Sequence, residues 1–335
     1  MTLDLATPDA YTSILFRSIN HLSDFLALNG IHPRITPTNM KIHRTIRSIL
    51  QNPFNQGHAV DALVRYLRWQ LGSRIAPGKV AIPWINEARL LVAPGDTGLT
   101  GCIYSGLHDY ADMSFLLRFL REEDIFLDVG ANAGAYTVLA SAAAGAQTIS
   151  FEPVPRTFAK LLDNVAINTI QDKVTAYNMG VGNKKETLNF SVDNGASNRV
   201  INNTNSSTPS TAVPVDTLDS ILQGSAPAAI KMDIEGFEYN ALTGASNTLA
   251  SQELCAIIIE LKEHALKYGS SNAAIDELIR SYGFLPYQYD NTSRTVSLST
   301  DGMKIGGNVL YLRNLEHVQH RLTTCAQFSI FGQTL

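Results

Sequence analysis

The chain has 335 residues, of which 45% are hydrophobic, and it carries a formal net charge of -4. This balance is that of a globular enzyme with one large domain and an extension, and no apolar run approaches the length of a membrane span. Because the chain is not basic and shows no aromatic-basic binding motif, we expect no nucleic acid among its partners.

Two further features predict a cytoplasmic protein. Residues 1–10 lack the basic region and the continuous apolar stretch of a signal peptide. The cysteines, Cys102, Cys255 and Cys325, are odd in number and far apart, which is typical of reduced thiols.

Residues 1–80 are predicted to form a helical extension. Apolar periodicity favours helices from Thr7 to Gly30, from Met40 to Leu50 and from Ala59 to Leu71. This part carries nine Lys and Arg against four Asp, whereas the remainder carries 17 basic against 26 acidic residues. A basic extension can attract an anionic acceptor. A solvated helix face, or self-association of the extension against the acidic domain, explains the same charges. A homo-oligomer formed through these helices is the corresponding expectation for partners. The arginines concerned are Arg44, Arg47, Arg65 and Arg68.

Residues 81–120 are predicted to bridge the extension and the main domain. Strands are expected at 80–84 and 88–92, with a turn at 94–98 that leads to a third apolar segment, Cys102-Ile103-Tyr104. Together they predict a small antiparallel cover. A helix is expected from Met113 to Leu120.

A glycine-rich turn joins an apolar strand to a helix at residues 128–137, Asp-Val-Gly-Ala-Asn-Ala-Gly-Ala-Tyr-Thr. Its two glycines let the backbone approach a ligand and direct amide groups of the helix start at it. A dinucleotide fingerprint reads Gly-x-Gly-x-x-Gly, whereas the spacing here is Asp-x-Gly-x-Asn-x-Gly. An acid at the strand end repels a pyrophosphate but suits the ammonium and sulfonium of S-adenosylmethionine. The residues expected to bind this cofactor are Asp128, Gly130, Ala131, Asn132, Gly134, Tyr136 and Thr137.

A second acid, Glu152, follows the next predicted strand at residues 147–151. In Rossmann-like sheets a carboxylate at this place accepts hydrogen bonds from ribose hydroxyls, so we expect Glu152 and the adjoining Pro153 to bind the cofactor. The alternative is a surface acid that opens the helix from Pro155.

A third strand is expected at 174–178, a turn at 180–183 and a hairpin arm at 186–192. The strand end is expected near the adenine of the cofactor. Residues 202–211 are almost entirely polar and predict a mobile loop that acts as a lid. The residues expected near adenine are Asn178, Met179 and Gly180, and those expected to contact the acceptor are Ser197, Asn198 and Arg199.

The chemistry is expected after the strand at 230–233, because open sheets bind ligands at the carboxyl ends of their strands. Methyl transfer to an alcohol requires alignment of donor and acceptor and removal of the hydroxyl proton. Asp233 is the preferred base, and burial or nearby acids would have to raise its pKa. Glu235 is expected to orient the acceptor. Lys231 lies on the same face as Asp233 and is either catalytic or a structural ion pair.

Other residues widen the choice of base. Glu260 closes a predicted strand at 256–259, and His264 follows four residues later. Glu238 is expected to lie on the following helix and to solvate its first turn. Clustered oxygen ligands of Asp233, Glu235 and Glu260 would also suit magnesium or calcium. No metal signature is present by spacing, so the prediction is a site without metal.

The end of the chain completes the predicted sheet. A helix is expected from Ala273 to Tyr282 and a last strand at 308–312. The main domain is therefore placed at 121–315, and residues 316–335 are left as a tail without assignment.

Three blocks of sequence together resemble the FkbM family of S-adenosylmethionine-dependent methyltransferases. They are residues 128–137, residues 151–164 with Phe-Glu-Pro-Val-Pro, and residues 230–238, Ile-Lys-Met-Asp-Ile-Glu-Gly-Phe-Glu. The blocks occur in the family's order, and the resemblance covers about residues 95 to 315. It implies an α/β fold, a Rossmann-like class I methyltransferase with a seven-stranded, mostly parallel sheet flanked by helices. In this family the segment before the sheet folds over the cofactor, which makes Tyr104 and His108 candidates for the pocket.

The resemblance implies an O-methyltransferase that uses S-adenosylmethionine, releases S-adenosylhomocysteine and methylates a hydroxyl of a carbohydrate. The acceptor would be a glycan or a sugar of a secondary metabolite. Two alternatives remain open: an NAD-dependent oxidoreductase, and a non-catalytic module that binds the cofactor.

Overall fold

The computed structural model describes residues 37–192, 199–201, 209–299 and 307–335. The chain divides into two compact units. One unit comprises residues 1–77 and 103–110, and the other comprises residues 78–102 and 111–335. The predicted helix at 7–30, the candidates Ser197 and Asn198, and most of the predicted lid lie outside the described residues.

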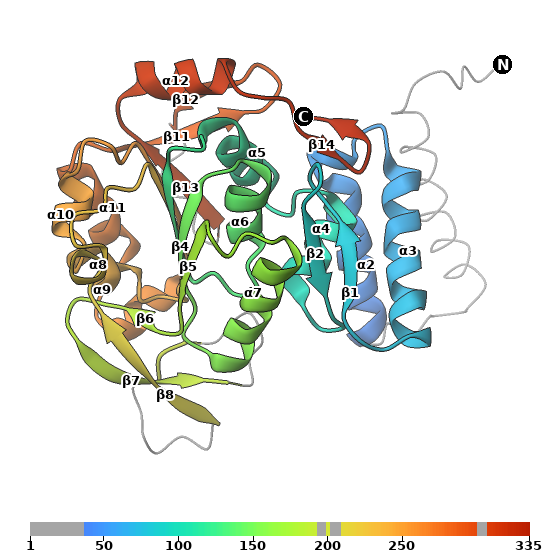
Figure 1. Ribbon diagram of the computed structural model, residues 1–335, viewed down its shortest axis with the longest axis horizontal. Coiled ribbons are helices and arrows are strands. Elements are labelled where there is room, and N and C mark those ends of the chain that lie inside the picture. Colours follow the sequence, from blue (N-terminus) through green and yellow to red (C-terminus); the bar gives the residue numbers. More distant parts are fainter. Residues whose placement is uncertain (1–36, 193–198, 202–208, 300–306) are drawn as a thin grey trace, which may run out of the picture. The chain divides into compact units, whose positions relative to one another are not determined.

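An eight-stranded sheet forms the centre of the larger unit (Figure 1). Its strands, in the order in which they lie side by side, are β12 (Thr295–Leu298), β11 (Leu285–Asp290), β13 (Gly307–Leu312), β10 (Ala256–Leu261), β9 (Ala229–Met232), β3 (Ile125–Val129), β4 (Gln147–Phe151) and β5 (Val174–Tyr177). Only β13 and β12 run against the direction of the others. The predicted mostly parallel α/β sheet is therefore confirmed, with one strand more than the seven expected, because β12 returns from β11 as a hairpin.

The strand order reverses between β3 and β9. From β3 the chain continues through β4 to β5 on one side, and β9 leads to β10 on the other. In open α/β sheets, ligands bind outside the carboxyl ends of the strands at such a switch point. The loop that begins at Gly130 and the loop that begins at Asp233 follow these two strands, so both lie where a ligand is expected.

The two faces of the sheet differ in chemistry. Leu127 and Ile230 belong to a core that also includes side chains of the helices α8 (Leu218–Leu222), α9 (Glu238–Thr243), α10 (Ser246–Ala250) and α11 (Asn272–Ser281). Figure 1 shows these helices on one side of the sheet. The helices α5 (Tyr110–Phe119), α6 (Ala135–Val138) and α7 (Pro155–Ile167) lie on the other side. Alternation along the strands turns Asp128 and Lys231 to this second face.

Several expected elements differ from the structure. The segment Cys102-Ile103-Tyr104 is part of a helix, α4 (Thr97–Ser105), and not a strand. A short apolar run cannot be assigned to helix or strand by periodicity alone, which explains the error. The helix after the glycine-rich loop continues from α6 into a π-helix, η2 (Leu139–Ala143). The predicted turn at 180–183 instead begins with a short strand, β6 (Gly180–Val181).

A smaller sheet extends the same unit. It contains β6, β8 (Ser210–Asp216) and β7 (Glu186–Ser191), in that order. Its side chains Phe190 and Val213 share a core with Val154 and Phe237, which follow β4 and β9. The small sheet therefore packs against the loops at the carboxyl edge of the large one.

The predicted hairpin before the sheet is present as β1 (Val80–Pro83) paired antiparallel with β2 (Arg89–Val92). It is fixed to α7, since the backbone N–H of Leu91 donates to the side-chain oxygen of Asn164 at 2.7 Å. The tail without assignment forms a helix, α12 (Leu315–Thr323), and a short hairpin of β14 (Ser329–Ile330) and β15 (Gln333–Thr334).

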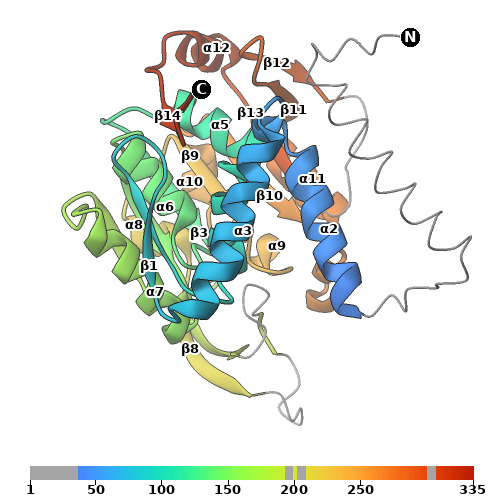
Figure 2. The ribbon, with the colours of Figure 1, turned by 90° about the vertical axis from the view of Figure 1, so that its right-hand side faces the viewer.

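The described part of the smaller unit consists mainly of two helices. These are α2 (Pro37–Gln51) and α3 (Ala59–Ile75), joined by a 3-10 turn, η1 (Pro53–Asn55), and they lie side by side in Figure 2. Tyr66 and Trp69 of α3 are buried. In all the residues that the structure describes, no helix combines the length and the apolar character needed to cross a membrane.

Candidate active site

The glycine-rich loop leaves β3 with left-handed backbone at three positions. The φ angles are +87° at Gly130, +50° at Asn132 and +92° at Gly134. Gly130 also lies against the loop after β9, because a Cβ atom at this position would be 2.0 Å from the carbonyl oxygen of Asp233. At Gly134 a Cβ would be 2.6 Å from the Leu161 side chain. Glycine is therefore required both by the backbone conformation and by the close approach of neighbouring atoms.

Asp128 is buried at the carboxyl end of β3. Its Oδ2 accepts a hydrogen bond from the Thr137 hydroxyl at 2.6 Å, and that hydroxyl is 2.8 Å from the Ser150 hydroxyl. Burial raises the pKa of Asp128 to about 6, although the Thr137 hydrogen bond and the charge of Lys231 act in the opposite direction. A buried carboxylate in this state favours a cationic neighbour.

Glu152 connects the glycine-rich loop to the start of α7. Its Oε2 accepts from the backbone N–H of Asn132 at 3.0 Å, and its Oε1 accepts from that of Val154 at 2.9 Å. The side chain is buried, and burial raises its pKa to about 7. Glu152 is thus neither exposed nor a simple cap of the helix, which was the alternative drawn from the sequence.

Asn164 of α7 supports the glycine-rich loop from behind. The side chain is fully buried, and its Nδ2 donates to the carbonyl oxygen of Ala133 at 2.9 Å. The same side chain also forms hydrogen bonds with the backbone of Leu91 in β2. Asn164 therefore fixes the glycine-rich loop relative to both α7 and β2. Sequence reasoning had noted Asn164 only as part of a motif.

The residues expected near the adenine lie after β5. Asn178 donates to the carbonyl oxygens of Glu152 and Pro153 at 2.9 and 3.0 Å, so it joins the loops after β4 and β5. Met179 is partly buried against the main core, and Gly180 is buried in the small sheet. Contact of these residues with a cofactor stays a prediction.

The loop after β9 is tightly folded. Glu235 has a φ of +56°, which is strained for a residue with a side chain, and Gly236 follows at +105°. The Oε1 of Glu238 accepts from the backbone N–H groups of Ile234 and Gly236, both at 3.1 Å. Glu238 lies in the first turn of α9 as expected, and it is buried and stabilises the loop before that helix.

Charged side chains of β9, of the loop after it and of the end of β10 lie close together. Carboxylate oxygens of Asp233, Glu235 and Glu260 lie within 4.8 Å of one another. The Lys262 Nζ is 2.7 Å from Glu260 Oε2, 2.9 Å from Glu235 Oε1 and 3.9 Å from Asp233 Oδ1. Lys231 is buried, and its Nζ is 4.0 Å from Asp233 Oδ2. The residues predicted for chemistry on β9 and β10 thus lie together.

Asp233 and Glu260 behave as one coupled pair. Burial would raise the pKa of Asp233, but Lys231, a hydrogen bond with Glu260 and Lys262 together lower it. Burial and Asp233 raise the pKa of Glu260 to about 8. A shared proton therefore rests on Glu260 while Asp233 is ionised. The raised pKa that the sequence argument required of Asp233 is found at its partner instead.

Lys262 was missed by the sequence analysis, although a signal was present. It follows Glu260 by two residues at the end of β10, and alternation along a strand places such residues on the same face. The predicted base His264 lies in a 3-10 helix, η4 (Glu263–Tyr268), and its side chain is outside the described part.

Two predicted pocket residues belong to the smaller unit. The Tyr104 hydroxyl accepts from the Gln70 side chain at 2.9 Å, and its ring packs edge-on against Tyr66. His108 follows α4. Their role at a cofactor stays a prediction.

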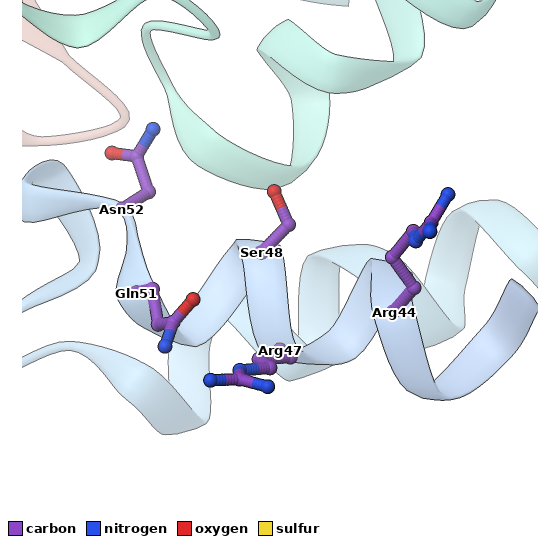
Figure 3. A pocket seen from close by; sticks show the side chains of 5 residues that line it. All are labelled: Arg44, Arg47, Ser48, Gln51 and Asn52. Carbon is purple, nitrogen blue, oxygen red and sulfur yellow. The ribbon is translucent and has the colours of Figure 1, made fainter. Parts of the chain in front are cut away.

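Arg65, Arg44 and Arg47 of the smaller unit differ in their surroundings. Arg65 donates to the Asn55 side chain at 2.8 Å and to the carbonyl oxygen of Ile103 at 3.1 Å, so its charge is used internally. A shallow hollow lies along α2, where the Arg44 and Arg47 side chains point to different sides of the helix (Figure 3). The hollow is lined by Arg44, Arg47, Ser48, Gln51 and Asn52.

Comparison with known families bears on which cofactor such a loop can bind. Residues 128–286 match the family described as the methyltransferase FkbM domain. This part of the chain is similar to an FkbM methyltransferase domain. The family predicted from the sequence and its Rossmann-like class I fold are therefore confirmed, and the nicotinamide alternative loses its support.

The FkbM domain also resembles individual proteins. Hexuronic acid methyltransferase AglP from Haloferax volcanii is 28% identical over 147 residues, which is 44% of this chain and 59% of that protein's length. The crystal structure of methyltransferase FkbM from Methylobacillus flagellatus is 17% identical with a TM-score of 0.39, covering 76% of this chain and 60% of that one. A putative methyltransferase from Streptococcus mutans in complex with SAH is 12% identical with a TM-score of 0.36, covering 60% and 93%.

Proposed function

We propose that this protein is an S-adenosylmethionine-dependent O-methyltransferase that methylates a hydroxyl group of a carbohydrate. The observation that carries the proposal is the pair of buried acids, Asp128 and Glu152, on either side of the glycine-rich loop at the switch point of the sheet. The carboxylates of Asp233, directly after β9, and of Glu260, on β10, lie close together.

The residues present fit this cofactor. Left-handed backbone at Gly130 and Gly134 folds the glycine-rich loop closely against the Asp233 carbonyl and the Leu161 side chain. The Glu152 carboxylate suits ribose hydroxyls as donors, and the buried Asp128 suits a positive charge. When bound, S-adenosylmethionine supplies an electrophilic methyl group on its sulfonium. The residues proposed to contact it are the predicted set from 128 to 137, with Glu152, Pro153, Asn178, Met179, Gly180, Tyr104 and His108.

The chain's own task is to position the acceptor and remove its proton. The Asp233 side chain is 40% exposed, so it can accept a hydrogen bond from the acceptor hydroxyl. The pair of Asp233 and Glu260 can accept the hydroxyl proton once Glu260 has lost the proton that it shares with Asp233. As the new oxygen–carbon bond forms, the hydroxyl proton then passes to this pair and rests on Glu260, whose pKa is the higher. Lys231 supports Asp233 through an ion pair at 4.0 Å. Glu235, in the loop after β9, supports the pair by binding Lys262.

A carbohydrate acceptor is supported by the relative named as a hexuronic acid methyltransferase. Arg199, which precedes β8, is proposed among the acceptor contacts together with Ser197 and Asn198. The test is incubation with S-adenosylmethionine and a panel of uronic acid, neutral and phosphorylated oligosaccharides. Mass spectrometry should detect the gain of one methyl group on an oxygen of the uronic acid. Methylation of none of these sugars, with the cofactor bound, would contradict the proposed acceptor.

The affinity for S-adenosylmethionine should rise from about pH 5 to about pH 8. The pKa values of Asp128 and Glu152 are about 6 and about 7, above their ordinary values of 3.8 and 4.5. Both acids are therefore partly protonated in the free protein at acid pH. A protonated acid has lost the negative charge that attracts a cationic group and strengthens hydrogen bonds from ribose hydroxyls. Each ionisation should contribute at most about tenfold in affinity per pH unit. Calorimetric titration across this range measures the effect, and an affinity independent of pH would contradict it.

The same pKa values affect stability in the opposite direction. Because both acids bind protons more tightly when folded, the free energy of unfolding of the free protein should fall as the pH rises from about 4 to about 7. Bound cofactor should offset this loss.

We also propose that the protein forms a homodimer through α3. The apolar residues Val60, Val64, Leu67 and Leu71 follow one another at spacings of four, three and four, and each exposes at least 36% of its surface. This spacing is that of a coiled-coil seam. In an antiparallel pair of α3 helices, the flanking Asp61 of one copy would lie near Arg68 of the other.

Light scattering tests the dimer. The protein should be a dimer, and Leu67→Glu should convert it to a monomer by placing a charge in the seam. Leu162→Glu on α7, where the leucine is also exposed, is the matched control and should leave the dimer intact. A monomeric parent protein, or a Leu67→Glu variant that stays dimeric, would contradict the proposal.

A cytoplasmic location stays part of the proposal. Cys102, Cys255 and Cys325 form no disulfide in the structure, which suits a reducing compartment.

A further inference from the structure

Lys262 lies in the middle of the acidic cluster beyond β10. Its Nζ is within 2.9 Å of both Glu235 and Glu260 and is 3.9 Å from Asp233. The side chain is 28% exposed, so its charge is partly shielded from water. One ammonium group therefore contacts or neighbours every carboxylate of the cluster.

The same three carboxylates have the spacing of a cation site. Their oxygens lie within 4.8 Å of one another, and clustered carboxylate oxygens are the ligands that magnesium, calcium and manganese prefer. A divalent ion bound by all three would have to occupy the space beside Glu235 and Glu260 that the ammonium occupies. Charge repulsion and overlap exclude both cations from the same place.

We infer that Lys262 is an internal counter-cation that takes the place of a divalent metal ion at Asp233, Glu235 and Glu260. The inference rests on the proposed function for its role in turnover. In that role Lys262 is a positioning residue. It holds Glu260 and the strained Glu235 in place while Asp233 faces the acceptor.

Lys231 does not provide this charge. Its Nζ is 4.0 Å from Asp233 and lies over the Tyr136 ring, 5.5 Å from the ring centre. Removal of Lys262 should therefore remove the ammonium group that contacts both Glu235 and Glu260.

The experiment measures manganese binding to the full-length protein by electron paramagnetic resonance, without any turnover. Lys262→Met should bind one Mn²⁺ at least about tenfold more tightly than the parent protein, because a unit charge within 4 Å has been removed. Lys262→Arg, which keeps the charge, should bind as weakly as the parent. Lys184→Met is the matched control, since it removes an exposed lysine that is paired only with Glu186 among the ion pairs of the described residues.

Two further variants locate the site and guard against misfolding. Adding Glu235→Gln to Lys262→Met should abolish the new manganese site. Lys262→Gln, which is neutral but keeps a hydrogen-bond donor, should gain the site as well if the methionine variant does not fold. Equal manganese affinity in the parent and the neutral variants, or no binding in a folded neutral variant, would overturn the inference.

The rescue of turnover by added metal is a second test. A purely structural role of Lys262 would not produce such a rescue. With S-adenosylmethionine and an acceptor, Lys262→Met should lose at least about tenfold in kcat, and Mg²⁺ or Mn²⁺ should restore a part of this loss while leaving the parent rate unchanged. Loss that no metal restores would limit Lys262 to stabilising the fold and contradict its positioning role. If no sugar is methylated at all, the proposed function fails, whereas the manganese result still decides whether Lys262 replaces a metal.

Discussion

Replacing Asp233 by asparagine should slow methyl transfer by about 10²- to 10⁴-fold and leave the affinity for S-adenosylmethionine unchanged. The amide keeps the shape of the side chain but cannot carry the negative charge that draws off the acceptor proton. Asp233 is partly exposed and precedes a loop that is fixed by Glu238, so the variant should keep its fold. Single-turnover rates and calorimetric titration with the cofactor measure the two effects separately.

Glu260→Gln should also slow methyl transfer, because the variant lacks the carboxylate that finally holds the acceptor proton. In the parent protein the rate should rise with pH through about 8, the pKa of Glu260, since the pair must be ionised before it can accept a proton. Asp172→Asn, at an exposed acid remote from β9 in sequence, is the control and should behave as the parent. An Asp233→Asn variant with parental rates would exclude Asp233 as the group that receives the proton.

Glu152→Ala should weaken the binding of S-adenosylmethionine by about 10- to 150-fold. Loss of a charged hydrogen-bond partner of the ribose corresponds to about 1.5 to 3 kcal/mol. The substitution also removes the acceptor of the Asn132 and Val154 backbone N–H groups, so the glycine-rich loop loses its connection to the start of α7. Titration calorimetry with S-adenosylhomocysteine measures the affinity.

Glu152→Gln separates these two contributions. The glutamine keeps one oxygen for a backbone N–H but loses the charge, so its affinity should lie between those of the parent and the alanine variant. Thermal unfolding of each free variant shows whether the loop has changed. If both variants bound the cofactor within a factor of about two of the parent, Glu152 would have no part in binding the ribose.

The elements that sequence patterns identified are those in which local and tertiary preferences agree. The second strand of the sheet lies at Gln147–Phe151 as predicted, because its apolar residues are flanked by a glycine-containing turn on one side and by Glu152 on the other. The apolar run at 102–104 was misassigned, since three residues carry too little periodicity to separate a helix from a strand.

Within the site, sequence order indicated which strand ends carry the acids but not how the acids share charge. Lys262 lies two residues beyond Glu260 and becomes part of the cluster only because β10 pairs beside β9. The burial of Glu238 depends on the left-handed backbone of Glu235 and Gly236, which no local pattern predicted. The lowered pKa of Asp233 and the raised pKa of Glu260 likewise depend on the contact between these two side chains.

A crystal structure of the protein with S-adenosylhomocysteine bound tests the central claim most directly. The ribose hydroxyls should lie within hydrogen-bond distance of Glu152, the amino group should lie on the side of Asp128, and the sulfur should face Asp233 and Glu260. A ligand bound with its ribose away from Glu152, or with its sulfur turned away from these two carboxylates, would contradict the account.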